Sequence, residues 1–210
     1  MKDIARFGAA AALLLTFVGC AKGESEPQRA PAGSCVCDDG VPGAVNPQLM
    51  AWLSKARTLH HLADLGQSDG GGEGAIPPLE ELVSGPKPQE VLPEVEEVLA
   101  DTYARLAELR AEHGDFAHAE QEIARGLSHA PGATYFHGHL LEVRGLVYEK
   151  LSVSLAKADK RVEAEEARQK AMRASLEAVR MQDEVIGKTL NAAATTGAAS
   201  AAPRNSNPRD

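Results

Sequence analysis

Residues 100–131 carry the pattern that most restricts how this chain can fold. Two runs of helical periodicity are separated by Gly114 and followed by Pro131, which are residues that end helices. Small residues in both runs would let two antiparallel helices approach closely, and larger ones would fill the groove between them. The segment therefore predicts a helical hairpin. Its contact positions are Tyr103, Leu106, Ala107, Ala119, Ile123, Gly126 and Leu127.

This spacing resembles the tetratricopeptide repeat, a helix–turn–helix unit of about 34 residues. Arg110 departs from the motif, because the repeat usually has an aromatic or aliphatic residue at that position. A second and looser copy follows, with roughly 10 residues more between its two halves than the repeat allows. That excess predicts two elongated helices. The matching positions of the second copy are Leu141, Gly145, Tyr148, Ala167, Ala171 and Ala174.

Further helices are expected on both sides of the hairpin. Asn46 and Pro47 form a typical helix start, and the helix that follows is expected to end at Gly66. A short helix is expected within 78–83, and longer ones over 93–113, 115–130, 134–158 and 160–190. Asp115 and Thr134 are expected to cap the helices over 115–130 and 134–158. Aromatic residues make up only 4 % of the chain, which fits helices better than a β-sandwich. The predicted fold class is all-α: antiparallel hairpins stacked as a short tetratricopeptide-like bundle or solenoid.

The N-terminus has the features of an export signal. Lys2 and Arg6 precede an apolar run, 7–18, that is too short to span a bilayer as a helix. The run ends at Gly19 and Cys20, and this end resembles the lipobox of bacterial lipoproteins. Phe17 departs from the leucine that is usual three places before the cysteine.

The lipobox resemblance implies that residues 1–19 are removed and that Cys20 is acylated on its thiol and its new amine. Several acyl chains anchor a protein stably, whereas one binds only marginally. Ala21 follows the cysteine. The absence of Asp there favours the outer membrane, with the body facing the periplasm. The domains expected are the signal peptide 1–19, a flexible tether 20–45, the helical domain 46–190 and a disordered tail 191–210.

The repeat resemblance also implies a surface for a protein partner, lined by the first helix of each hairpin. This surface is mostly acidic, so a basic or helical segment of an envelope protein is the expected partner. The protein is thus expected to be a membrane-tethered interaction scaffold or adaptor. The residues expected on the surface by register are Asp101, Ala104, Glu108, Glu112, His139 and Glu142.

Other functions have less support in the sequence. The formal net charge is −8 and no basic stripe is present, so nucleic acid is not expected as a partner. No nucleophile elbow or phosphate-binding glycine loop occurs, so neither an enzyme nor a cofactor is expected. Cys35 and Cys37 would meet an oxidising compartment after export and could form a disulfide. The alternative function is metal binding by Cys35 and Cys37 with histidines, although the histidine spacings do not match a metal-binding helix.

Overall fold

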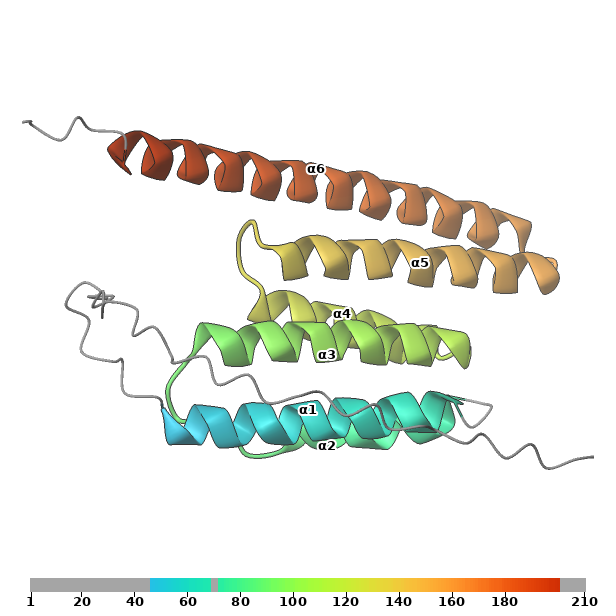
Figure 1. Cartoon of the computed structure of the whole chain (residues 1–210). Helices are drawn as coiled ribbons and strands as arrows, with labels where there is room; N and C mark the ends of the chain where they lie inside the picture. Colours follow the sequence, from blue (N-terminus) through green and yellow to red (C-terminus); the bar gives the residue numbers. More distant parts are fainter. Residues whose placement is uncertain (1–45, 69–71, 201–210) are drawn as a thin grey trace, which may run out of the picture. The chain divides into compact units, whose positions relative to one another are not determined.

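The described part of the chain consists of helices and the short connections between them, with no β-strand. The computed structural model describes residues 46–68 and 72–200, with side chains as far as residue 193, so Cys20, Cys35 and Cys37 lie outside it. Six α-helices pack against one another, and a short 3-10 helix, η1, precedes α2 (Figure 1). This confirms the predicted all-α class. The bounds are α1 Pro47–Ser68, η1 Glu73–Ala75, α2 Ile76–Ser84, α3 Pro93–Glu112, α4 Phe116–His129, α5 Tyr135–Lys157 and α6 Arg161–Ser200.

Three helices begin at the polar caps expected from the sequence. The side-chain oxygen of Asn46 accepts the amide N–H of Gln48 at 3.0 Å. A carboxylate oxygen of Asp115 accepts the amide N–H of His118 at 3.3 Å, and the hydroxyl of Thr134 accepts the amide N–H of His137 at 3.1 Å. These bonds satisfy backbone donors that have no partner within the first turn of a helix. The starts of α1, α4 and α5 are therefore fixed locally.

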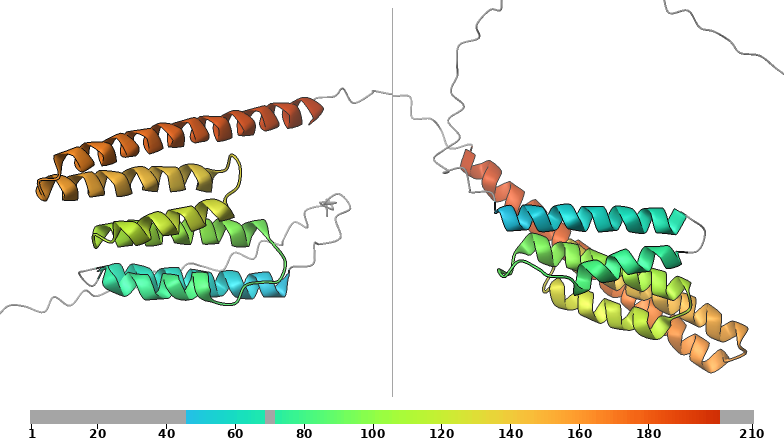
Figure 2. Two further views of the ribbon diagram at one scale, coloured as in Figure 1. Left: turned by 180° about the vertical axis from the view of Figure 1, so that it is seen from behind. Right: turned by 90° about the horizontal axis from the view of Figure 1, so that it is seen from below.

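Helix α3 contributes residues to each cluster of the hydrophobic core. It packs on α4 and α5 on one side and on α1 and α2 on the other (Figures 1 and 2). One side of α3 contributes Ala100, Ala104 and Ala107 to a cluster with α4 and α5. Leu99 contributes to a second cluster around Trp52, and further α3 residues contribute to a third with α2. Each of the three clusters within residues 46–68 and 72–200 therefore contains residues of α3.

Helices α5 and α6 form a closely packed antiparallel pair. A methyl group added at Gly145 would lie 2.7 Å from the Oγ of Ser175 and 3.5 Å from the carbonyl oxygen of Ala171. On α6, Ala167 and Ala174 are buried. The second, elongated hairpin predicted from the sequence therefore forms, with small residues at the contact between its helices.

Two expectations about helix ends are wrong. Helix α1 does not end at Gly66 but continues to Ser68. A methyl group at Gly66 would lie 2.4 Å from the carbonyl carbon of Gly74, so this glycine allows a close approach of two backbones. Helix α6 also continues ten residues beyond 190, into the segment expected to be a disordered tail. Alanine has the highest helix propensity, and an alanine-rich segment readily extends a helix that has already formed.

Candidate partner-binding site

Five of the six residues expected on the partner surface lie together on α3 and α5. We call Asp101, Glu108, Glu112, His139 and Glu142 the acidic face. Glu108 is half-buried and interacts electrostatically with the other four residues. Burial raises the pKa of its carboxyl group, His139 opposes that shift, and the three acidic neighbours add to it. Negative charge is therefore concentrated at the contact between the two helices.

The sixth residue is not on this face. Ala104 has no exposed surface and belongs to the cluster that α3 shares with α4 and α5. Its expected place in the partner surface is wrong. The stripe of α3 that packs on the next hairpin is Ala100, Ala104, Ala107 and Ala111. Those alanines allow the helices to approach closely, so this position is used for packing.

The acidic face continues towards α1. The Nε2 atom of His60 lies 2.9 Å from the hydroxyl of Thr102, and Arg105 forms an ion pair with Asp64 across the two helices. Burial lowers the pKa of His60; Asp101 and Asp64 act against that shift, and Arg105 adds to it. A pocket of about 350 Å³ lies beside these groups, between α1, α3 and α5. It is lined by Leu53, Ala56, Arg57, His60, Val98, Asp101 and Phe136.

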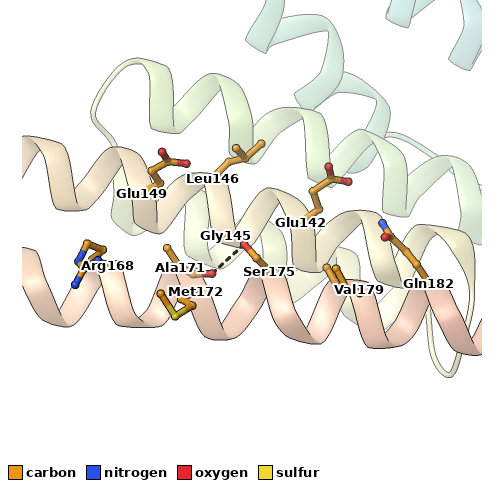
Figure 3. A pocket seen from close by; sticks show the side chains of 11 residues that line it. Glu142, Gly145, Leu146, Glu149, Arg168, Ala171, Met172, Ser175, Val179 and Gln182 are labelled. Carbon is orange, nitrogen blue, oxygen red and sulfur yellow. Dashed lines mark hydrogen bonds between the residues drawn. The ribbon is translucent and has the colours of Figure 1, made fainter.

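A longer groove of about 560 Å³ runs between α5 and α6. Leu146 of α5 and Met172 and Val179 of α6 line it, and Figure 3 shows these side chains along the same groove. Glu142 and Glu149 also line it, on the α5 side. The groove thus combines exposed apolar side chains with carboxylates. A partner helix that carries both apolar and basic residues would match this surface.

Three histidines, His60, His129 and His137, join different parts of the helical structure. The Nδ1 atom of His129 lies 2.7 Å from a carboxylate oxygen of Glu96, and its ring stacks on Tyr103 at a centroid distance of 5.5 Å. His137 contacts the carbonyl oxygen of Ala130 at 2.8 Å. Within residues 46–68 and 72–200, no three His, Cys, Asp or Glu residues are grouped so as to hold a metal ion. The possible site at Cys35 and Cys37 lies outside this region and stays a prediction.

Sequence reasoning missed the ion pair between Asp64 and Arg105 and the apolar groove lined by α6. The ion pair joins residues 41 positions apart, so no local pattern indicates it. The apolar residues of α6 do recur at regular spacing in the sequence. That pattern is readable without a structure, but on its own it does not distinguish a buried face from an exposed one.

No helix in the described part of the chain is both long enough and apolar enough to cross a membrane. No known family model matches the chain, and neither a curated protein nor a solved structure matches it significantly.

Proposed function

We propose that the protein is a lipid-anchored, non-enzymatic scaffold or adaptor of the bacterial cell envelope that uses no bound cofactor. The single observation that carries the binding role is the acidic face, where four carboxylates and His139 gather on two adjacent helices. The export and anchoring roles rest on the lipobox resemblance at Cys20. The outer membrane, with the body in the periplasm, is the proposed location.

The partner segment should be basic. Glu112 and Glu142 are exposed and Asp101 is partly exposed, so cationic side chains can reach them. Glu112 forms a long ion pair with Lys150 at 3.8 Å, and a carboxylate oxygen of Glu142 lies 3.7 Å from the Nδ1 atom of His139. Exposed ion pairs of this kind contribute little to stability. They can therefore be exchanged for contacts with a partner at little cost.

The test is a crosslinked pull-down from membranes with the full-length chain. Replacing Asp101→Asn, Glu112→Gln and Glu142→Gln together keeps side-chain size and removes three charges. We expect the partner to be recovered with the wild type and lost with this variant. A matched control, Glu163→Gln with Glu166→Gln and Glu177→Gln, also removes three exposed carboxylates, all of them on α6 and outside the acidic face. Equal recovery with both variants would contradict the assignment of the partner surface.

The anchor has its own test. Cys20→Ala should release the protein from membranes, because the acylated thiol is lost while the helical domain is unchanged. Membrane association that survives Cys20→Ala would contradict the lipoprotein proposal.

The metal-binding alternative has a separate test. It predicts stoichiometric metal in the purified wild type, and loss of that metal when Cys35→Ser and Cys37→Ser are combined. That result would replace the pure scaffold proposal.

A further inference from the structure

Helix α6 carries a stripe of exposed apolar residues that its own fold does not use. Met172, Leu176, Val179, Ile186 and Leu190 are each between 54 and 65 % exposed. Asp183 completes the series, in which consecutive members are alternately four and three residues apart. We call these six residues the α6 stripe. Isolated exposed apolar residues are common, but a continuous row marks a surface that is covered in the working molecule.

The rest of the fold does not cover this stripe. The buried residues of α6 are alanines on a different side of the helix, Ala164, Ala167, Ala174 and Ala178. Among the described helices, α6 packs extensively only on α5. It is also the last helix described in the stack, and a stacked helical protein needs a polar outer face on its terminal unit to stay soluble. The α6 stripe is apolar where a polar face is needed.

The spacing of the stripe points to another helix with the same spacing. Alternating separations of four and three residues form the a and d positions of a heptad repeat, which pack between paired helices. We propose that the α6 stripe binds the α6 stripe of a second copy of this chain, in antiparallel orientation. In this symmetric dimer, a two-fold axis passes beside Met181.

In an antiparallel pair, each residue of the α6 stripe lies opposite a residue of the α6 stripe in the second copy. Met172 lies opposite Leu190 of the partner subunit, and Leu176 lies opposite Ile186 of the partner subunit. A two-fold interface requires this reciprocity, because each contact must occur twice. Met172 and Val179 also line the groove between α5 and α6, where Leu146 extends the apolar surface (Figure 3).

Asp183 determines the orientation. A parallel pair would place the two Asp183 carboxylates in the same layer of the interface, where like charges repel. The antiparallel pair separates them and places Asp183 opposite Val179 of the partner subunit. Arg180 follows Val179 in the sequence, so each Asp183 then lies beside the partner subunit's Arg180. The only acidic residue of the stripe thus gains an opposite charge from the second copy.

Disulfide crosslinking tests the geometry. In the full-length chain with its three native cysteines changed to serine, Leu176→Cys and Ile186→Cys are introduced together. These positions are about 15 Å apart along one helix, too far for a bond within a chain. Oxidation should therefore give a covalent dimer with the double variant and none with either single variant. A monomer from the double variant overturns the proposal, and a dimer from Leu176→Cys alone overturns the antiparallel orientation.

Sedimentation equilibrium of the full-length chain in density-matched detergent tests the interface without engineered cysteines. The wild type should have the mass of a dimer, and Leu176→Glu with Ile186→Glu should have that of a monomer with unchanged helix content. Leu65→Glu is the matched control, since Leu65 of α1 is 51 % exposed and outside the stripe. It should remain dimeric. A monomeric wild type, or equal loss of the dimer in the control, overturns the dimer proposal. The dimer proposal does not depend on partner binding at the acidic face.

Discussion

At the scale of single residues, Gly126 shows how one small side chain determines the distance between helices. A methyl group at this position of α4 would lie 2.6 Å from the Cδ2 atom of Leu140 and 3.1 Å from the Cβ atom of Tyr103. Leu140 is completely buried, so it has no open space into which to move. Gly126 therefore allows α4 to approach both α3 and α5.

Gly126→Ala should lower the free energy of unfolding by about 1–2 kcal/mol. Overpacking a dense core costs about 1–3 kcal/mol, and the higher helix propensity of alanine offsets up to about 1 kcal/mol of that cost. Urea denaturation followed by circular dichroism measures the change. The matched control is Gly187→Ala in α6, where the added methyl group would meet no atom within 4 Å. That substitution should be neutral or stabilising, and destabilisation of equal size in both variants would contradict the packing argument.

The acidic face should make stability depend on pH through Glu108. Because its pKa is raised above the ordinary value of 4.5, the folded protein holds this proton more tightly than the unfolded chain does. The stabilisation that comes from this tighter proton binding is fully present below about pH 4.5. It is lost as the pH rises through the folded-state pKa of Glu108. Glu108→Gln should thus be more stable than the wild type at pH 7.5, with a smaller difference at pH 4.

Urea denaturation at the two pH values measures this difference. Glu97→Gln is the control, because Glu97 is exposed on the same helix and is not among the charges that act on Glu108. It should not reproduce the change with pH. If Glu108→Gln were less stable than the wild type at pH 7.5, the carboxylate would be stabilising, contrary to the argument from burial.

At the scale of elements, the contact between α5 and α6 depends on small residues over much of its length. Gly138 and Gly145 of α5 both lie close to α6 atoms, and the buried residues of α6 are alanines. Such a contact gains from close packing of many atoms and has few large side chains to fill a gap. Separation of the two helices by one bulky residue should therefore loosen α6 without unfolding the other helices.

Gly145→Val should weaken this contact by about 1–3 kcal/mol, because the new side chain would overlap Ser175. Hydrogen exchange measures the effect helix by helix. Amides of residues 164–178 should exchange roughly tenfold faster or more, while those of α3 keep their protection. Lys150→Val is the control, since Lys150 is exposed on the same helix and its ion pair is with Glu112 of α3. Equal loss of protection in α3 and α6 would show that α6 does not open as a separate unit.

At the scale of the whole molecule, α3 links the two sides of the core. Trp52, the only tryptophan of the chain, lies in the cluster formed by α1, α2 and the start of α3. Leu140 lies in a different cluster, which α3 forms with α4 and α5. Because α3 contributes to both clusters, loss of packing in one should destabilise the other.

Leu140→Ala should lower the free energy of unfolding by about 2–5 kcal/mol, because it leaves a cavity at a completely buried site. Trp52 fluorescence and far-ultraviolet circular dichroism should report the same shift of the urea midpoint, although Trp52 is in the other cluster. An unchanged fluorescence midpoint would mean that the two sides of α3 unfold independently. Coincidence of the two probes is the standard criterion for cooperative unfolding.

Local chemistry in the sequence determined the helices themselves. The caps at Asn46, Asp115 and Thr134 and the helical spacing of apolar and small residues predicted the all-α class and the elongated second hairpin. Those features act within one or two turns of the backbone, so they can be read from neighbouring positions. The helical register also predicted that Asp101, Glu108 and Glu112 share a side of α3, and that His139 and Glu142 share a side of α5.

Only the tertiary structure decided the features that depend on residues far apart in the chain. The sequence predicts a helix end at Gly66, but in the structure this glycine lies inside α1 and allows the backbone of Gly74 to approach closely. Arg110, which departs from the repeat motif, forms an ion pair with Glu80 of α2. Ala104 has the same helical spacing whether it faces a partner or a neighbouring helix, and only the packing of α4 and α5 shows that it is buried. Helical spacing specifies which residues share a face, whereas burial depends on what packs against that face.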